Sequence, residues 1–359
     1  MRRDILEIDS RSTGGPVNLQ LHLQDIESLR ILLAGHSVID WQRLAFRHRT
    51  DVDRFLATHC VDVHDPIDRE RIRYVYNEAV SYLEEQLRLR FPRELRDPPD
   101  VRDVFVWASQ WGGFRRTQIL SCVILKLMHV IHHMEAADLK FRLPVSEADY
   151  LELAHRRILR QAQEMQDTGA PLVAFYGSRK SRSSMITKLL AKREAVAATI
   201  FDKLRYRVVV ERHDDIAAVL AWMARDLFPF NYVVPGESHN NLLDPSTLIA
   251  RIPADERREA VERAIPFSST FTKNEFSGSS YRAINWITDY AVRIPERVEN
   301  PYEMELGRVV YVNVEFQLID EATARTNEEG DNAHPVYKAR QYKRVARRLK
   351  RGASAPRDD

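Results

Sequence analysis

Cysteine is scarce in this chain, and so is any excess of charge of one sign. Its 359 residues include two cysteines, Cys60 and Cys122, which are too few for a disulfide framework or a zinc site built from cysteines. The 54 Lys and Arg residues are nearly balanced by 52 Asp and Glu, so the net charge is +2 and no general affinity for polyanions is expected. We therefore expect a globular protein that works in the reducing cytoplasm.

Long hydrophobic runs are missing as well. The polar start, residues 1–4, is not followed by the apolar core of a secretory signal. The most apolar stretch, residues 119–131, is interrupted by Lys126 and is shorter than the about 20 residues that cross a bilayer, so it predicts a buried helix and no membrane partner. His129 and His133 lie one turn apart there. Because one helix supplies no third metal ligand, they are predicted to be structural, with a metal site as the alternative.

The spacing of apolar residues changes near residue 167. Before it, helical periodicity dominates, and we predict a helical domain whose role the sequence does not reveal. The predicted helices cover residues 68–89, 101–111, 117–139 and 146–165.

After a Gly-Ala-Pro break at residues 169–171, short β-rich runs alternate with helices, as in a mixed α/β domain. The predicted fold class is α+β, with an all-helical N-terminal domain (1–167) followed by a mixed β-sheet flanked by helices (168–338). Residues 240–278 are polar and irregular and predict an insertion or a long loop. Residues 339–359 predict a basic helix and a disordered tail. That helix is either simply solvated or a surface for tRNA or other RNA.

Residues 309–318 predict a strand with two unlike faces. Alternate side chains of a strand point to opposite sides of the sheet. One side is apolar and the other polar, the first set being Val312, Val314, Phe316 and Leu318 and the second Asn313, Glu315 and Gln317. The polar side either floors a binding cleft or is merely solvated.

Residues 177–184, Gly-Ser-Arg-Lys-Ser-Arg-Ser-Ser, open a predicted helix with cations and hydroxyl groups. A helix start offers free backbone N–H groups and the positive end of the helix dipole, both of which attract phosphate. Lys180, Ser184 and Lys188 recur every four residues, a spacing that suits a polyphosphate. The alternative is a solvated helix start capped by Ser183.

Asp202 lies at the predicted junction between this helix and a strand at residues 206–210. A carboxylate at such a junction can hold a magnesium ion that bridges phosphates. Arg207, five residues later, can point from the strand toward the same cleft. The alternative is an ordinary ion pair between a helix-terminal Asp and a neighbouring Arg.

Five segments, taken in order, resemble motifs of the RelA/SpoT-type alarmone synthetase domain, a branch of the nucleotidyltransferase superfamily. The motifs are R-x-K-S-x-x-S-x-x-x-K, D-L-x-x-x-R, G-Y-x-S-x-H, V-E-x-Q and H-x-x-Y-K. The matching residues are, in turn, 178–188, 202–207, 280–285, 314–317 and 334–338. An ordered set over about 160 residues is far more specific than any single motif.

The resemblance implies a reaction and a set of roles. It implies transfer of the β,γ-pyrophosphate of ATP, with Mg²⁺, to the ribose 3′-hydroxyl of a nucleotide, usually GDP or GTP. It implies that Asp202 and Glu315 bind the metal, and that Glu315 helps to deprotonate the acceptor. Further implied roles are phosphate binding by Arg179, Lys180, Ser184, Lys188 and Arg207 and acceptor binding by Tyr281, Asn285 and Gln317. The last motif adds His334, Tyr337 and Lys338 as further candidate site residues.

The chain departs from the motifs on the acceptor side. In the phosphate-binding motif, Ser178 also replaces an Arg, for which the neighbouring Arg179 or Arg182 can substitute. Ser280 replaces a Gly, and Asn285 replaces a His and cannot become a cation. We therefore expect an unusual acceptor, either a nucleotide or the 3′ end of an RNA. The alternative function is a catalytically degenerate nucleotide sensor or regulatory protein on the same fold.

Overall fold

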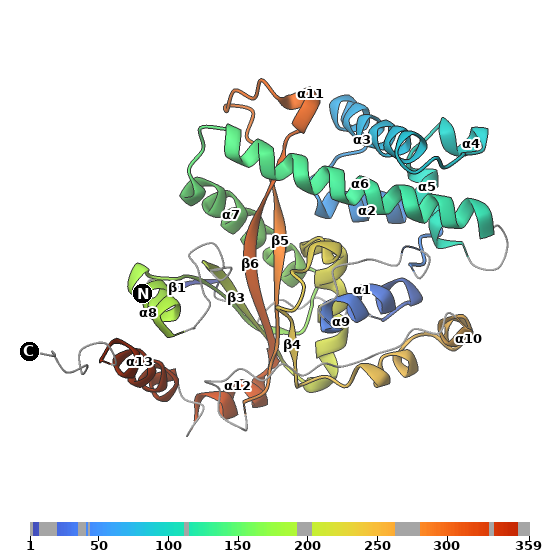
Figure 1. Ribbon diagram of the computed structural model, residues 1–359. Coiled ribbons are helices and arrows are strands. Elements are labelled where there is room, and N and C mark those ends of the chain that lie inside the picture. The colour runs from blue at the N-terminus through green and yellow to red at the C-terminus, as the bar shows by residue number, and fades with distance from the viewer. Residues whose placement is uncertain are drawn as a thin grey trace, which may run out of the picture.

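One mixed β-sheet with helices packed around it forms the centre of the protein (Figure 1). The structure is a computed structural model, and the predicted α+β fold class is confirmed. It describes residues 3–6, 20–34, 41, 44–110, 115–191, 203–262, 281–329 and 334–350.

The described part before residue 168 is mainly helical. The helices predicted at residues 68–89, 101–111, 117–139 and 146–165 are confirmed as α3, α5, α6 and α7. This part of the chain also contains one strand, β1 (Arg3–Leu6), which pairs antiparallel with the next strand and forms the edge of the sheet. The helices are α1 (Leu23–Ala34), α2 (Arg49–Thr58), α3 (Pro66–Glu85), α4 (Arg93–Arg96), α5 (Arg102–Ser109), α6 (Arg115–Arg142) and α7 (Glu147–Asp167).

Helix α6 corrects one expectation. It has 28 residues, and by length and composition alone it could cross a membrane. Only 33% of its most apolar window is buried inside the protein. The apolar stretch is therefore part of a longer helix that is buried along one side, on which Ile124, Leu125 and Leu139 enter the core. Helices α3 and α5 pack against that side.

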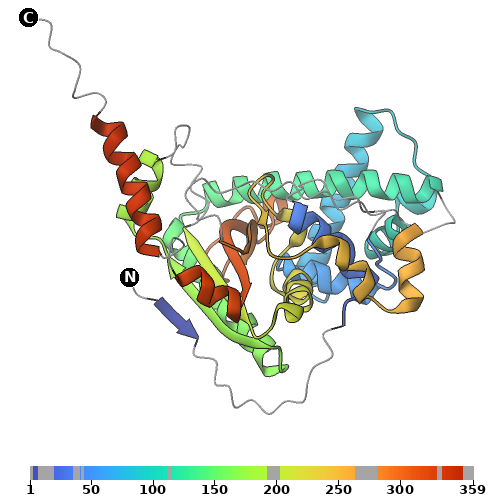
Figure 2. The ribbon, with the colours of Figure 1, turned by 90° about the horizontal axis from the view of Figure 1, so that it is seen from below.

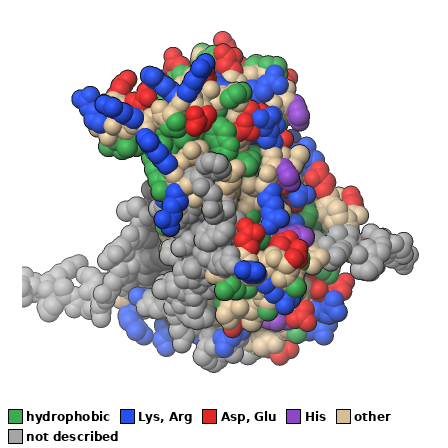
Figure 3. All heavy atoms as spheres, turned by 90° about the vertical axis from the view of Figure 1, so that its right-hand side faces the viewer, with side chains coloured by type: hydrophobic (Ala, Val, Ile, Leu, Met, Phe, Trp, Pro, Cys, Tyr) green, Lys and Arg blue, Asp and Glu red, His purple; other side chains and the backbone are tan. Residues whose placement is uncertain are grey.

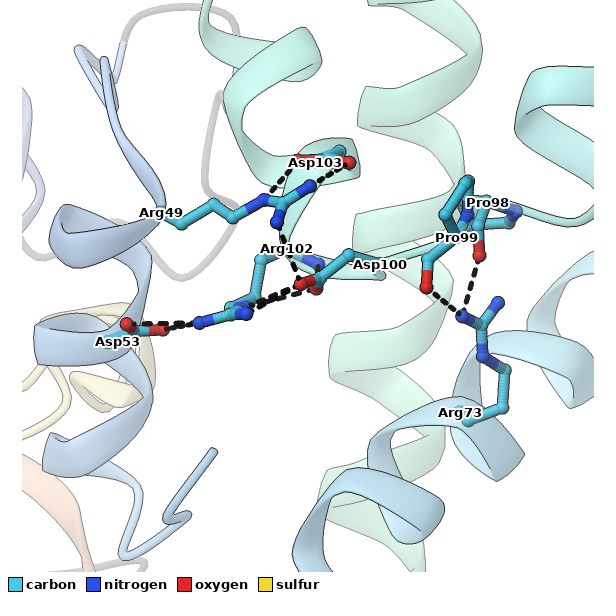
Figure 4. A network of polar contacts seen from close by, with 8 residues as sticks. All are labelled: Arg49, Asp53, Arg73, Pro98, Pro99, Asp100, Arg102 and Asp103. Atoms are coloured by element: carbon cyan, nitrogen blue, oxygen red, sulfur yellow. Dashed lines mark hydrogen bonds and ion pairs between the residues drawn. The ribbon is translucent and has the colours of Figure 1, made fainter. Parts of the chain in front are cut away.

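Arginine–aspartate pairs tie α2 to α5 (Figure 4). Arg49 of α2 donates two hydrogen bonds to Asp103, of 2.7 and 2.8 Å. Arg102 of α5 reaches Asp53 of α2 at 3.0 Å and its own neighbour Asp100 at 2.6 Å. These ion pairs neutralise the charges of a segment rich in both Arg and Asp, and they hold α5 against α2.

The sheet has six strands in the order β1-β2-β3-β6-β5-β4. Strands β3 and β6 run parallel, and every other neighbouring pair is antiparallel. After β1 the strands are β2 (Leu172–Arg179), β3 (Leu204–Val210), β4 (His239–Asn240), β5 (Ile284–Arg293) and β6 (Val309–Asp320).

The two sides of the sheet differ as the alternation in residues 309–318 predicts. The apolar side of β6 is fully buried, and Phe316 stacks between Tyr206 of β3 and Trp286 of β5 at ring-centroid distances of 5.6 and 5.5 Å. Helix α7 and helix α9 (Ile216–Trp222) pack on the sheet, and Phe228, just beyond α9, stacks on Phe316. We call this side the apolar face and the opposite side the polar face.

The predicted insertion at residues 240–278 is described only in part. It contains short 3₁₀ turns and α10 (Ala254–Glu262), while residues 263–280 lie outside the described residues. Helix α10 docks on the N-terminal part, where Glu256 lies 3.1 Å from the His22 ring and Glu259 lies 3.1 Å from Arg47. The predicted domain boundary at residue 167 stays a prediction. Buried residues from both sides of it share one core.

The C-terminal helices flank the sheet. They are α11 (Glu303–Leu306), α12 (Glu321–Glu328) and α13 (His334–Lys350). The basic helix predicted near the C-terminus begins earlier than residue 339, and it packs along α8 (Arg182–Ala191) in both ribbon views (Figures 1 and 2). Residues 351–359, the predicted tail, lie outside the described residues.

Candidate functional site

The polar face gathers side chains from four strands. Register sets Arg205 opposite both Ser178 and Glu315, and Arg207 opposite both Tyr176 and Gln317. Strand β5 adds Asn285 opposite Gln317 and Asp289 opposite Asn313. Since alternate residues of a strand share one side, all of these side chains belong to one surface.

Gln317 is the hub of this surface. It is fully buried, and its side-chain oxygen accepts a 2.6 Å hydrogen bond from Nε of Arg207. Its amide nitrogen donates to Oδ1 of Asn285 at 2.9 Å and to the hydroxyl of Tyr281. Because every part of the amide is used, its orientation is fixed, and with it the positions of Tyr281 and Asn285. Three of the five motif segments therefore meet at Gln317.

The first and last motif segments meet at the start of α8. The Ser181 hydroxyl lies 3.0 Å from the hydroxyls of Ser183 and Ser184, and it accepts from the Ser184 N–H at 3.3 Å. Lys338 of α13 donates to the Ser184 hydroxyl at 3.4 Å. An ammonium group and serine hydroxyls thus meet at a helix start, where the helix dipole also favours phosphate.

Arg179 is not brought to this surface. Strand alternation places it opposite Leu204 on the apolar side, and its guanidinium pairs with Glu152 of α7. Its neighbour Ser178, which stands at the motif's Arg position, is the one that lies opposite Arg205 on the polar face. The prediction that Arg179 substitutes for the missing arginine is therefore corrected, because a one-residue step along a strand reverses the side.

Several predicted site residues cannot be placed. Asp202 lies outside the described residues, and so do the side chains of Lys188, His334 and Tyr337. Glu315 is described. Its side chain is 17% exposed, and one of its oxygens lies 3.6 Å from Nε of Arg205. The predicted approach of Asp202 and Glu315 stays a prediction.

A second carboxylate on the polar face was missed by the sequence reasoning. Asp289 accepts a 2.6 Å hydrogen bond from Asn313, and its other oxygen lies 3.1 Å from Nε2 of His133 in α6. It is a diagonal neighbour of Glu315, since it stands opposite Asn313, two positions along β6. The sequence carried a signal for this residue, because Asn285 and Asp289 are four residues apart and therefore share one side of a mostly apolar strand.

Histidines and tyrosines cover the upper end of the polar face, where α6 crosses β5 and β6 (Figure 1). The ring of His59 lies 2.9 Å from the Tyr311 hydroxyl and 2.9 Å from Oδ1 of Asn231. Burial lowers the pKa of His132 to about 3 and, aided by the charge of His133, that of His129 to about 4. These rings are neutral at physiological pH.

The chemistry open to this arrangement is anion binding and positioning. Mg²⁺ in phosphate-transfer sites usually takes one or two carboxylates and completes its shell with phosphate oxygens and water. Glu315 fits one such ligand. Within the described residues no three His, Cys, Asp or Glu side chains form a protein-only metal cluster, so phosphate would have to complete the shell.

No family model matches the chain, and no curated protein matches its sequence. Among solved structures it is similar to small alarmone synthetase 1 from Bacillus subtilis, at 13% identity and a TM-score of 0.31 over 57% of this chain and 92% of that one. It is also similar to small alarmone synthetase 2 from Bacillus subtilis (14%, TM-score 0.31, 58% and 99%). A GTP pyrophosphokinase family protein from Streptococcus pneumoniae is similar at 15% identity (TM-score 0.28, 58% and 90%).

Proposed function

We propose that the chain binds ATP with Mg²⁺ and transfers its β,γ-pyrophosphate to the ribose 3′-hydroxyl of a nucleotide. The observation that carries this proposal is the convergence of the motif segments in two anchored groups. Gln317 joins Arg207, Tyr281 and Asn285 on the polar face, and Lys338 meets Ser184 at the start of α8. Two such groups suit the two substrates of a transfer reaction.

The group at the start of α8 would hold the donor. Pyrophosphate transfer depends on charge neutralisation and in-line placement more than on covalent catalysis. The N–H groups that start α8, together with Lys180 and Lys338, supply fixed positive charge for a triphosphate. When bound, Mg²⁺ would neutralise charge that develops on the phosphates, with Glu315 and Asp202 as its protein ligands.

The group around Gln317 would hold the acceptor. The Tyr281 ring is held by its hydroxyl and packs in part against Ala283 and Ile319, and its exposed side would stack on a base. Asn285 accepts from Gln317 through its oxygen, so its NH₂ group can donate to a base carbonyl. The carboxylate of Glu315 would take the proton from the attacking 3′-hydroxyl.

The test follows the γ-phosphate. Purified protein is incubated with γ-labelled ATP, Mg²⁺ and either a panel of nucleotides or tRNA, and labelled products are separated by chromatography. We expect a labelled nucleotide and at least about a 100-fold lower turnover for Glu315→Gln, with ATP affinity retained. The matched control is Glu321→Gln, a carboxylate of α12 paired with Arg325. Label on tRNA alone would replace the nucleotide acceptor with RNA.

One observation favours the alternative of a nucleotide sensor. Arg205 lies 3.6 Å from Glu315, so a fixed cation already stands beside the carboxylate proposed for the metal. A sensor would bind nucleotide by calorimetry with the same affinity in the wild type and in Glu315→Gln, and would form no labelled product with any acceptor. That pair of results would reject the transferase and retain the binding site.

A further inference from the structure

Helix α6 carries a strict seven-residue repeat on its outward side. Apolar residues follow one another at alternating steps of three and four, which is the spacing of a coiled-coil seam. The repeat runs over 22 residues and consists of Leu120, Val123, Leu127, Val130, Met134, Ala137 and Phe141. We call this set the α6 seam.

The seam is increasingly exposed toward the end of the helix. Leu120, Val123 and Leu127 are partly buried, whereas Val130 is 47% exposed, Met134 67% and Phe141 90%. The opposite side of α6 enters the core, and the first three seam residues pack against that core in part, whereas the seam from Val130 onward stays outside it. Figure 3 looks onto the end of the molecule at which α6 begins, and hydrophobic side chains gather there between the charged groups of the upper part. Contiguous exposed apolar surface of this kind marks an interaction site.

We propose that the α6 seam pairs antiparallel with the α6 seam of a second copy of this chain. The repeat is self-complementary in one register. There Leu120 meets Ala137 of the second copy, Val123 meets Met134, and Leu127 meets Val130, so a larger side chain faces a smaller one in each layer. The antiparallel arrangement also sets the helix dipoles in opposition, which is the favourable orientation.

Charges at the helix ends fit the same register. Arg115 and Arg116 are exposed and form no ion pair with the described residues. In the proposed register Arg116 lies opposite Phe141 of the second copy, which permits a cation–π contact. Asp138 of the second copy, which pairs with Arg142 of its own helix at 2.7 Å, then lies within about one turn of both arginines. Each seam therefore supplies partners for the ends of the other.

The size of the surface suits a dimer. Tyr74 of α3, 37% exposed, and Met304 of α11, 51% exposed, lie near the C-terminal half of α6, since Arg71 pairs with Glu135, stacks on Tyr74 and donates to the Met304 carbonyl. A large side chain loses on the order of 150–250 Å² when fully covered, so these exposed groups amount to on the order of 600 Å² per copy. Stable interfaces bury about 800 Å² per partner, which flanking charged side chains would complete.

A lipid surface fits less well. Glu78, Glu135 and Glu305 surround Tyr74 closely enough to raise its pKa, after the larger effect of burial. Asp138 adds another acid beside the seam. Helix α6 also carries Lys126, Lys140 and Arg142, so its border has charges of both signs. Membrane-surface helices carry a purely basic border that is attracted to anionic lipid, and the acids here oppose that attraction.

The oligomeric state of the full chain tests the proposal independently of any activity. Light scattering after size exclusion should give about twice the chain mass of 41.8 kDa at concentrations on the order of 10–100 µM. Met134→Glu and Phe141→Glu should each give the single-chain mass with unchanged circular dichroism. The control Val261→Glu, on α10 and 66% exposed, should remain dimeric. A monomeric wild type, or a dimer that survives both seam substitutions, would overturn the proposal.

Disulfide trapping tests the register. Chains carrying Leu127→Cys are mixed with chains carrying Val130→Cys and oxidised, with the wild type, which keeps Cys60 and Cys122, as the background. The mixture should form cross-linked dimers faster than either variant alone, because disulfides need Cα atoms within about 7 Å. Faster self-linking of Leu127→Cys would reject the register. Seam-dependent binding to phosphatidylglycerol vesicles by a monomeric wild type would assign the seam to lipid instead.

Discussion

The two faces of the sheet are made by the same strands, yet they are held together by different forces. On the apolar face, Phe316 is sandwiched among Tyr206, Trp286 and Phe228, with ring centroids 5.5 to 5.6 Å apart. On the polar face, its neighbour Gln317 is equally buried but is held by hydrogen bonds. Burial of rings stabilises the fold without requiring a particular partner. An amide whose oxygen and NH₂ group are hydrogen-bonded instead fixes the orientation of the side chains around it.

This difference assigns separate tasks to adjacent residues. The apolar face needs only volume and contact, so its contribution should appear in the free energy of unfolding. The polar face holds charged and amide groups at defined positions, so its contribution should appear in ligand affinity and turnover. Each prediction below perturbs one face and asks whether the other is affected.

The largest effect is expected from Phe316→Ala. Removing a buried aromatic ring from the centre of the stack should lower the free energy of unfolding by about 3–5 kcal/mol. Urea unfolding followed by circular dichroism measures the loss. The polar face should keep its nucleotide affinity in the folded fraction. A loss below about 1 kcal/mol would show that the stack is not the centre of the core.

Acid should act on the covered end of the polar face. The pKa of His132 is lowered to about 3 and that of His129 to about 4 by burial, whereas both titrate near 6.5 in the unfolded chain. The unfolded state thus binds more protons below pH 6.5, so stability is complete above that pH and falls as the pH drops toward 4. We expect a loss of about 2 kcal/mol for each ring between pH 7 and pH 5, or about 4 kcal/mol for both.

His132→Phe isolates this effect. The substitution removes a buried titrating ring whose Nε2 has no hydrogen-bond partner in the described part of the chain, and it should flatten the pH dependence of stability. His64→Phe, at an exposed position, is the control. Identical slopes in wild type and His132→Phe would contradict the assignment.

Much of the sheet could be predicted because strand alternation is a local property. Residues 312–318 gave the correct two sides, and the helix predicted at residues 146–165 is α7, whose first turn is capped by the Ser146 hydroxyl, which accepts from the Asp149 N–H at 3.2 Å. The basic C-terminal helix also followed from its own residues. In each case the pattern lies within a few turns or one strand, so no knowledge of distant partners is required.

The features that were missed depend on pairing between distant segments. Asp289 gained its meaning only when α6 placed His133 beside it, 156 residues away in the chain and 3.1 Å away in space. Arg179 was expected to substitute for the missing Arg, but it lies opposite Leu204 on the apolar side, which a motif cannot reveal because it gives spacing and not register. The exposure of the α6 seam likewise depends on which side of the helix α3 and α5 cover.

Gln317→Ala should separate binding from stability. Arg207, Tyr281 and Asn285 would lose their common partner, and affinity for the acceptor should fall about 10-fold, equivalent to about 1.4 kcal/mol. Isothermal titration with nucleotides measures it. The matched control is Gln161→Ala, since Gln161 bonds Tyr290 and the Asp226 carbonyl away from the polar face. Equal losses of affinity in both variants would mean that the effect is a general loosening of the fold.

The smallest effect on stability is expected from Arg205→Ala. Its contact with Glu315 is 3.6 Å long and its side chain is 38% exposed, so the pair should contribute no more than about 0.5 kcal/mol. On the function side the result is more telling. If Arg205 serves mainly to attract an anionic nucleotide, affinity should fall at low salt and recover toward the wild-type value as salt rises, because screening removes the same attraction from both proteins. Arg212→Ala, an exposed arginine paired with Asp215 outside the polar face, supplies the baseline. A difference in affinity between Arg205→Ala and the wild type that persists at high salt would instead mean that Arg205 contacts the nucleotide directly. The polar face would then bind through a specific hydrogen bond and not through long-range electrostatic attraction.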